Sequence, residues 1–290
     1  YMGDWSSDVC SSDLSPYSNH GRVGAADGPA VLRRALANLP WPASREVPLL
    51  DAGDVLCTDD ALEQAQEALG RRVAEVLSRG HWPLVMGGGH EVAWGSFQGI
   101  AAGLRGPARV GVVNFDAHFD LRGTLDGGRG TSGSPFLQIA DVLASRGSPF
   151  RYLCIGVSPG SNTPALFATA AARGSEWLLD EDLVWSELPR ALEQIDRFVA
   201  SVDVIHLSLC LDVFPGSVAP GVSAPAARGL PVDVAFVLLR RLLERAGLAP
   251  CGGKVVLVEI AELNPRFDRD GCTARLAARL AFEAARPLLI

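Results

Sequence analysis

The chain contains 290 residues, of which 48% are hydrophobic and 20% are charged, and its formal net charge is −7. This balance is typical of a globular domain and excludes a disordered chain, which would lack the apolar surface needed to fold. The absence of any basic cluster argues against nucleic-acid binding, and no apolar run approaches the ~20 residues of a membrane span. Six cysteines without CxxC spacing favour a reducing, cytoplasmic compartment over a disulfide framework.

The first fifteen residues differ in composition from the rest of the chain. They read YMGDWSSDVCSSDLS, with three Asp, five Ser and neither Lys nor Arg. No basic segment precedes an apolar one, so this stretch is not a secretory signal. We expect residues 1–15 to be a frayed terminus or a foreign segment, in which Cys10 and Asp13 have no functional role. Residues 16–290 are predicted to form a single domain.

From residue 21 onward, apolar runs alternate with helical patterns. In chain order we expect a helix within 21–39, a strand at 46–55, a helix at 60–79, strands at 83–89, 109–118, 151–157 and 176–180, a helix at 184–199, a strand at 203–212, a helix at 232–246, a strand at 254–263 and a helix at 272–286. The strands are continuous apolar runs, which is typical of strands buried on both faces. The pattern therefore predicts an α/β fold of three layers, with a central, mostly parallel sheet of about eight strands between helices.

Polar residues gather where four of these strands end. They are His90 after the strand at 83–89, Asp116, His118 and Asp120 at the end of 109–118, Cys210 and Asp212 at the end of 203–212, and Glu262 at the end of 254–263. The carboxyl ends of parallel strands meet at one edge of the sheet, where binding sites form. The glycine-rich stretch 122–133 is predicted to be a loop beside this site.

The residue types in this group indicate a metal site. In an extended chain Asp116, His118 and Asp120 point to one side, and two carboxylates with an imidazole suit Mn²⁺, Zn²⁺ or Fe²⁺. Cys210 and Asp212 share a face in the same way. With His90 the set exceeds the needs of one ion and indicates two metals that activate a hydroxide. The alternative is a group of solvated turn residues.

Two further polar residues carry no predicted chemistry. Ser208 has no neighbouring His–Asp pair, which leaves nucleophilic serine chemistry unsupported. His206 lies in the middle of a predicted strand, and we expect it to be packed in the core.

Four motifs in order resemble the ureohydrolases, the arginase and agmatinase family. They are GGGHEVAWG (87–95), FDAHFD (115–120), SLCLDVFPGSVAPGVSAP (208–225) and AELNPRFDRDGCTARLA (261–277). The segments SGSPFLQIAD (132–141) and GVSPGSNTPALF (156–167) are most similar to the formimidoylglutamase branch of this family, which acts in histidine degradation. The resemblance covers the chain from about residue 21 to its end and implies an arginase-like fold.

The resemblance implies two Mn²⁺ ions and a specific ligand set. One ion would be held by His90, Asp116, Asp120 and Cys210, and the other by Asp116, His118, Cys210 and Asp212. It further implies that Asp120 handles the proton of a metal-activated hydroxide and that Glu262 binds the amidinium of the substrate by a charge-assisted hydrogen bond. Hydrolysis of the amidine C–N bond of N-formimidoyl-L-glutamate would release L-glutamate and formamide. Members of the family commonly form homo-oligomers.

The two carboxylates of this small-molecule substrate call for cations or amide donors at the site. The candidates in the sequence are Arg122, two residues after Asp120, Arg129 in the glycine-rich loop, and Asn162 in the loop after the strand at 151–157. The alternative for each of these residues is an ordinary polar role at the surface.

The sequence departs from the family pattern at two functional places. Cys210 stands where the family has a bridging Asp, and a thiolate is softer than a carboxylate, which puts the second Mn²⁺ site in doubt. The loop at 130–136 lacks the His that shuttles protons in arginases, which favours the formimidoylglutamase branch. Two alternatives stay open: another ureohydrolase that acts on a guanidino compound, and a metal-binding homologue with impaired catalysis.

Overall fold

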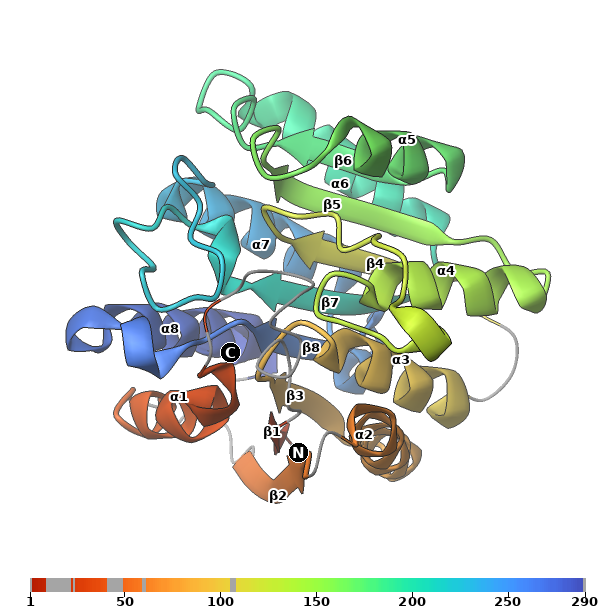
Figure 1. Ribbon diagram of the computed structural model, residues 1–290, viewed down its shortest axis with the longest axis vertical. Coiled ribbons are helices and arrows are strands. Elements are labelled where there is room, and N and C mark those ends of the chain that lie inside the picture. Colours follow the sequence, from red (N-terminus) through yellow and green to blue (C-terminus); the bar gives the residue numbers. More distant parts are fainter. Residues whose placement is uncertain are drawn as a thin grey trace.

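The computed structural model describes residues 2–8, 22, 24–40, 49–58, 61–104 and 108–288. Its centre is an eight-stranded sheet in which every neighbouring pair of strands is parallel (Figure 1). The strands are β1 (Met2–Asp8), β2 (Leu49–Leu56), β3 (Trp82–Met86), β4 (Val110–Phe115), β5 (Arg151–Val157), β6 (Glu176–Leu179), β7 (Val204–Cys210) and β8 (Val255–Ala261). Their order across the sheet is β2-β1-β3-β8-β7-β4-β5-β6. The predicted three-layer α/β fold is confirmed.

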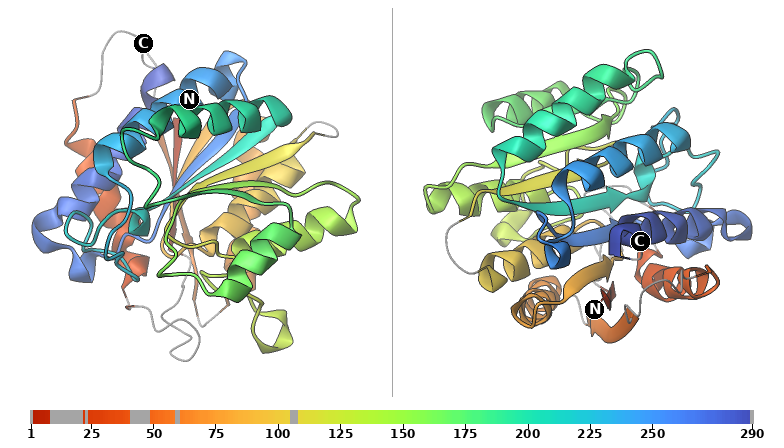
Figure 2. Two further views of the ribbon diagram at one scale, coloured as in Figure 1. Left: turned by 90° about the horizontal axis from the view of Figure 1, so that it is seen from above. Right: turned by 180° about the vertical axis from the view of Figure 1, so that it is seen from behind.

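Helices cover both faces of the sheet (Figure 2). They are α1 (Gly28–Ala37), α2 (Leu62–Ser78), α3 (Val92–Gly103), α4 (Pro135–Ser145), α5 (Pro164–Ala172), α6 (Leu188–Ser201), α7 (Val232–Ala246) and α8 (Cys272–Ala285). One face packs against α1, α6, α7 and α8, and the other against α2, α3, α4 and α5. Among the described residues, no helix combines the length and the apolarity needed to cross a membrane.

The burial of the strands explains their composition. All residues of β3, β4 and β8 are buried, because helices cover both faces of these central strands. Helix α2 shows the other pattern: its buried residues include Leu62, Leu69 and Val73, which lie on one face at helical spacing.

The observed elements shift some predicted boundaries. Helix α6 begins at Leu188 rather than at residue 184, with Pro189 in its first turn, where the missing proline N–H costs no helical hydrogen bond. Strand β2 begins at Leu49, and the part of the predicted strand at 46–48 lies outside the described residues.

Strand β1 lies within residues 1–15, the segment whose composition differs from the rest of the chain. Residues 2–8 pair in parallel with β2 on one side and β3 on the other, so a frayed terminus does not describe them. Residues 9–15, with Cys10 and Asp13, lie outside the described residues. That the segment is foreign stays a prediction.

Candidate metal centre

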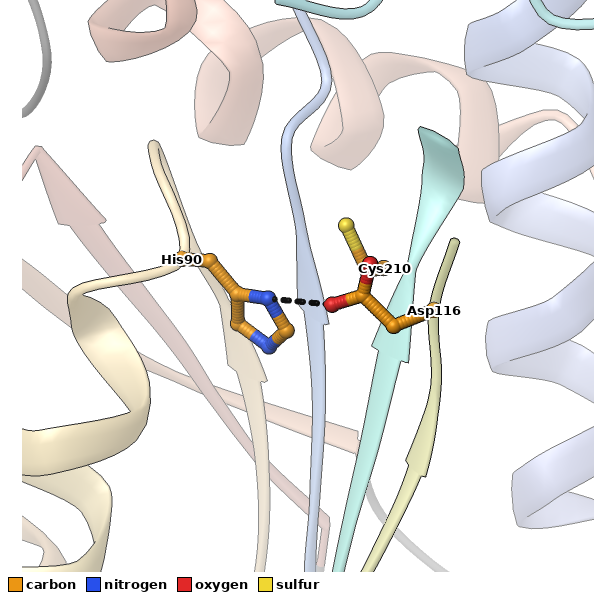
Figure 3. Close-up of side chains that lie close together, drawn as sticks. All are labelled: His90, Asp116 and Cys210. Carbon is orange, nitrogen blue, oxygen red and sulfur yellow. Dashed lines mark ion pairs between the residues drawn. The ribbon is translucent and has the colours of Figure 1, made fainter. Parts of the chain in front are cut away.

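The polar residues singled out from the sequence converge at the carboxyl ends of four neighbouring strands. His90 follows β3, Glu262 follows β8, Cys210 ends β7 and Asp116 follows β4. Figure 3 shows the side chains of His90, Asp116 and Cys210 directed toward one another from three of these strands. The edge of the sheet that the strand pattern predicts is therefore where the structure gathers them.

The metal motif after β4 converges by a different geometry from the one that alternation predicts. The chain bends at residues 117–118 instead of continuing as a strand, and Asp120 adopts a left-handed backbone with φ of 48°. Glu262, at the end of β8, is also left-handed, with φ of 69°. Such conformations cost a non-glycine residue about 1–3 kcal/mol and gather at functional sites. The convergence of the motif is thus built by a strained turn rather than by an extended strand.

His90 faces two carboxylates with its Nδ1 atom. This nitrogen lies 2.9 Å from Oδ2 of Asp116 (Figure 3). It also lies 2.9 Å from Oδ2 of Asp120, and neither contact has the geometry of a hydrogen bond. Neighbouring ligands of one ion, each about 2.1 Å from it, are about 3 Å apart. Ser208 lies 2.8 Å from the other ring nitrogen, Nε2, and fixes the ring with Nδ1 toward the carboxylates. The spacing of these three atoms fits a metal.

A second group of donors shares Asp116. Its Oδ1 atom lies 3.4 Å from Nδ1 of His118, and the same nitrogen lies 3.1 Å from Oδ2 of Asp212. One oxygen of Asp116 therefore faces His90 and the other faces His118. A carboxylate between two imidazoles is suited to bridge two cations.

Cys210 lies with His90 and Asp116 in the first of the two donor groups. Its sulfur, Nδ1 or Nε2 of His90, and a carboxylate oxygen of Asp116 all lie within 4.8 Å of one another. Burial and the nearby carboxylates, Asp116 first, raise the pKa of the Cys210 thiol well above its usual value. A cation bound to the sulfur acts in the opposite direction and removes the proton.

The electrostatics of the site also call for cations. Burial, reinforced by the charge of Asp116, raises the pKa of Asp120 to about 6, and burial with the charge of Asp212 raises that of Glu262 to about 7. Burial likewise raises the pKa of Asp212. Buried carboxylates are stable as anions only when they are paired or coordinate metal. The donor set and the crowding of negative charge both fit two divalent ions.

A pocket opens over these candidate metal ligands. Its wall combines the candidate ligands with Glu262 and loop residues: His90, His118, Asp120, Asp212, Glu262, Arg122, Ser132, Gly133, Ser223 and Ala224. The main chain of Arg122 donates to the carbonyl of Gly133 over 2.8 Å and closes the glycine-rich loop beside the site, as predicted. Among the described residues, the guanidinium of Arg122 has no hydrogen-bond or ion-pair partner.

The other two predicted substrate residues do not line this pocket. Arg129 lies farther along the glycine-rich loop. Asn162 is buried behind residues 116–120, which we call the metal loop. Its amide donates to the carbonyls of Ala117 and Ser158, and its Oδ1 accepts from the main chain of Phe119. Because these three bonds use its carboxamide, the structure supports a positioning role for Asn162 in place of substrate binding.

The contacts of Ser208 with His90 and of His206 with Glu259 were not predicted from the sequence. Ser208 supports the ring of His90, and its place two residues before Cys210, on the same face of β7, was the available signal. His206 lies in the core as expected, but its Nε2 atom is 3.0 Å from Oε1 of Glu259 on the neighbouring strand. His206 and Glu259 are both fully buried, and they form a close imidazole–carboxylate contact in the core without the geometry of a hydrogen bond.

The fold and the site define the class of protein: this chain belongs to the arginase family. The model of that family matches residues 12–286. Two relatives named formimidoylglutamase, from Ralstonia nicotianae and Aeromonas hydrophila, are 51% and 48% identical over 90% and 91% of this chain and over 78% and 81% of their own. The resemblance identified from the motifs is confirmed.

Solved structures show the same relationship. The Trypanosoma cruzi formiminoglutamase with Mn²⁺ superimposes with a TM-score of 0.82 at 26% identity, over 99% of this chain and 93% of that one. The formimidoylglutamase from Bacillus subtilis superimposes with a TM-score of 0.84 at 22% identity, over 100% of this chain and 87% of that one, which supports the fold alone.

Proposed function

We propose that this protein hydrolyses N-formimidoyl-L-glutamate to L-glutamate and formamide, a reaction of histidine degradation. The observation that carries the proposal is a pair of largely buried groups of metal donors that share Asp116 and open into a pocket walled by Glu262 and Arg122. The relatives named formimidoylglutamase support the choice of substrate.

Two Mn²⁺ ions are the proposed cofactors, as in the Trypanosoma cruzi structure. His90, Asp116, Asp120 and Cys210 would hold one, and Asp116, His118, Cys210 and Asp212 the other. When bound, the ions supply Lewis acidity that makes water nucleophilic near neutral pH.

Glu262 is the proposed partner of the amidine group of the substrate. Its Oε1 atom accepts from the main chain of His90, whereas its buried Oε2 atom makes no hydrogen bond of good geometry among the described residues. This oxygen can accept from the N–H groups of an amidinium and orient its carbon toward the metal donors.

Asp120 is the proposed carrier of the proton. Its left-handed backbone puts the carboxylate at the pocket wall beside His90, and a carboxyl group within hydrogen-bond reach of both nucleophile and leaving nitrogen can carry a proton between them. The leaving nitrogen must gain a proton when the C–N bond breaks and glutamate departs.

Arg122 is the proposed partner of a substrate carboxylate. Arg122 lines the pocket, its guanidinium has no partner among the described residues, and its Cδ atom packs so closely over Gly133 that a Cβ there would lie 2.9 Å away. Gly133 thus leaves room for the arginine to lie along the wall.

One observation keeps the metal-binding homologue as a second candidate. Cys210 occupies a donor position in place of a carboxylate, and a soft ligand lowers the preference of a site for Mn²⁺. An arginase-like activity is less supported, because the pocket-lining part of the loop at 130–136 presents Ser132 and Gly133 and no His.

The test is formamide release from N-formimidoyl-L-glutamate by the purified, Mn²⁺-loaded protein, with arginine and agmatine as parallel substrates. We expect turnover of the first substrate alone. Urea production from arginine or agmatine would assign another ureohydrolase activity. No turnover with full metal occupancy would support the impaired homologue. A cytoplasmic location and a homo-oligomer stay predictions, to be checked by fractionation and sedimentation.

A further inference from the structure

A row of polar residues crosses the buried sheet directly beneath the metal donors. Asn114 of β4 lies in register with Ser208 of β7 on one side and Cys154 of β5 on the other, and Ser208 is in register with Glu259 of β8. All four are fully buried. Strands buried on both faces are otherwise apolar, so a polar row at this level needs a partner for each group.

Both N–H groups of the Asn114 side chain donate hydrogen bonds. Its Nδ2 atom donates to Oδ2 of Asp116 over 3.0 Å and to the hydroxyl of Tyr152 over 3.1 Å. The other oxygen of Asp116 accepts from the main chain of His118 over 2.7 Å. The carboxylate shared by the two donor groups is therefore held from both sides, which fixes its rotation.

Tyr152 connects Asn114 to the backbone of the metal loop. Its hydroxyl accepts from Asn114 and donates to the carbonyl of Phe119, over 3.0 Å, next to Asp120. The Tyr152 hydroxyl can make both bonds at once, because a phenol donates one hydrogen bond and can accept another.

The ring of Tyr152 reaches the metal donors by a second route. It stacks on Phe136 at a centroid distance of 4.8 Å, and Phe136 in turn meets the imidazole of His90 edge-on at 5.2 Å. The same residue thus supports Asp116 and the loop through its hydroxyl and His90 through its ring.

We propose that Asn114 and Tyr152 are positioning residues that set the orientation of Asp116 and thereby the affinity of the site for its metals. This inference rests on the proposed metal centre. Hydrogen-bonding partners behind metal ligands typically change metal affinity 10- to 100-fold when they are removed. Neither residue touches the pocket, so their effect reaches the substrate only through the metal ligands.

Tyr152→Phe is the sharpest variant, because it keeps the aromatic stack and removes only the hydroxyl. Asn114→Leu is the second variant, of similar size, and removes both donors. Trp82→Phe is the matched control: its indole N–H donates to the carbonyl of Val255 over 3.1 Å in the core, at the opposite end of the sheet. It loses a buried hydrogen bond to a carbonyl, as Tyr152→Phe does.

The experiment measures Mn²⁺ dissociation constants and stoichiometry by equilibrium dialysis of the metal-stripped full chain, together with thermal unfolding without metal. We expect Tyr152→Phe to weaken Mn²⁺ binding about tenfold or more and Asn114→Leu to weaken it further, while Trp82→Phe lowers the unfolding temperature without changing Mn²⁺ affinity. Wild-type affinity in Tyr152→Phe and Asn114→Leu would overturn the positioning role and leave the proposed function intact. Failure of the unsubstituted protein to bind Mn²⁺ would overturn both.

Discussion

The main chain of His90 donates a hydrogen bond of 2.9 Å to Oε1 of Glu262, across 172 residues of sequence. The main chain of Glu262 in turn donates to the carbonyl of Gly88 over 2.8 Å. The segments after β3 and β8 are therefore joined in both directions. One consequence is that the proposed amidine-binding carboxylate is set at a fixed place relative to the first metal donor.

Glu262→Gln tests the charge of this carboxylate. The amide oxygen can still accept from His90, but the charge-assisted bond to an amidinium is lost, which corresponds to about 1.5–3 kcal/mol. We expect kcat/KM for N-formimidoyl-L-glutamate to fall about 10- to 100-fold with unchanged Mn²⁺ stoichiometry. Glu63→Gln, an exposed change in α2, is the control. Unchanged kcat/KM in Glu262→Gln would rule out amidinium binding there.

Cys210→Asp tests whether the sulfur of Cys210 is a metal ligand and how it sets the preference of the site between Mn²⁺ and Zn²⁺. A carboxylate is harder than a thiolate, so we expect the variant to gain affinity for Mn²⁺ and to lose affinity for Zn²⁺ in a competition measurement. The buried residue Cys57 lies in a separate part of the core, and Cys57→Ala serves as the control. If Cys210→Asp leaves the relative affinities of the two metals unchanged, the sulfur is not a ligand. A large gain in Mn²⁺-dependent turnover would indicate that the native site is impaired.

Arg122→Ala tests the wall of the pocket. Loss of a charged bond to a substrate carboxylate weakens binding in the ground state and the transition state alike, so KM should rise about tenfold with little change in kcat. Arg129→Ala changes an arginine of the same loop outside the pocket wall, and we expect its KM to stay near the wild-type value. Equal KM values for the two variants would exclude Arg122 as the carboxylate partner.

The acid sensitivity of the fold depends partly on Asp203. Arg109 donates to this carboxylate from its guanidinium and its main chain, which lowers the pKa of Asp203 to about 2. An Asp with a lowered folded pKa stabilises the protein above its unfolded pKa of about 3.9, and that contribution disappears as the pH falls through the folded pKa. We expect the difference in melting temperature between wild type and Asp203→Asn to be constant from about pH 5 to 7.

Between about pH 4 and pH 2 this difference should shrink toward zero. A double-mutant cycle with Arg109→Gln assigns the effect to the pair. A difference that persists at about pH 2 would show that Asp203 acts by another route.

Gly229 packs against the main chain of residues 213–215, close in sequence to the pocket residues Ser223 and Ala224. Its φ is 73°, and a Cβ there would lie 2.5–2.8 Å from main-chain atoms of residues 213–215, which cannot move aside as a side chain can. We expect Gly229→Ala to cost several kcal/mol in urea unfolding, on the order of a left-handed penalty plus a steric overlap. Gly174→Ala has φ of 69° with open space around it and isolates the penalty of about 1–2 kcal/mol. Similar losses in both variants would refute the steric argument.

Much of the site could be predicted because its residues follow strand ends. Continuous apolar runs identify buried parallel strands, and the carboxyl ends of such strands share one edge. This rule places His90, Asp116, Cys210 and Glu262 together without any coordinates. It says nothing of how the chain turns after each strand, so the left-handed backbones of Asp120 and Glu262 were beyond it.

The direction of the Asn162 side chain could not be predicted from the sequence. A polar residue in a loop beside a site can face the ligand or the backbone, and the sequence does not distinguish the two. Its side chain turns inward to bond Ala117, Ser158 and Phe119. The choice follows from which main-chain groups of the metal loop lack partners in the folded state, a property of the whole arrangement.

Three features could be predicted without the structure: the class of fold, the edge of the sheet that carries the site and the types of donor gathered there. They follow from local periodicity and from the residues next to strand ends. The register between strands, in contrast, is known only from the folded chain. Register brings Asn114 beside Ser208 and Cys154, and packing brings Tyr152 to Phe119 and His90 to Glu262. Contacts between residues so far apart in the chain depend on how side chains fill the space between strands and helices, which no local pattern encodes.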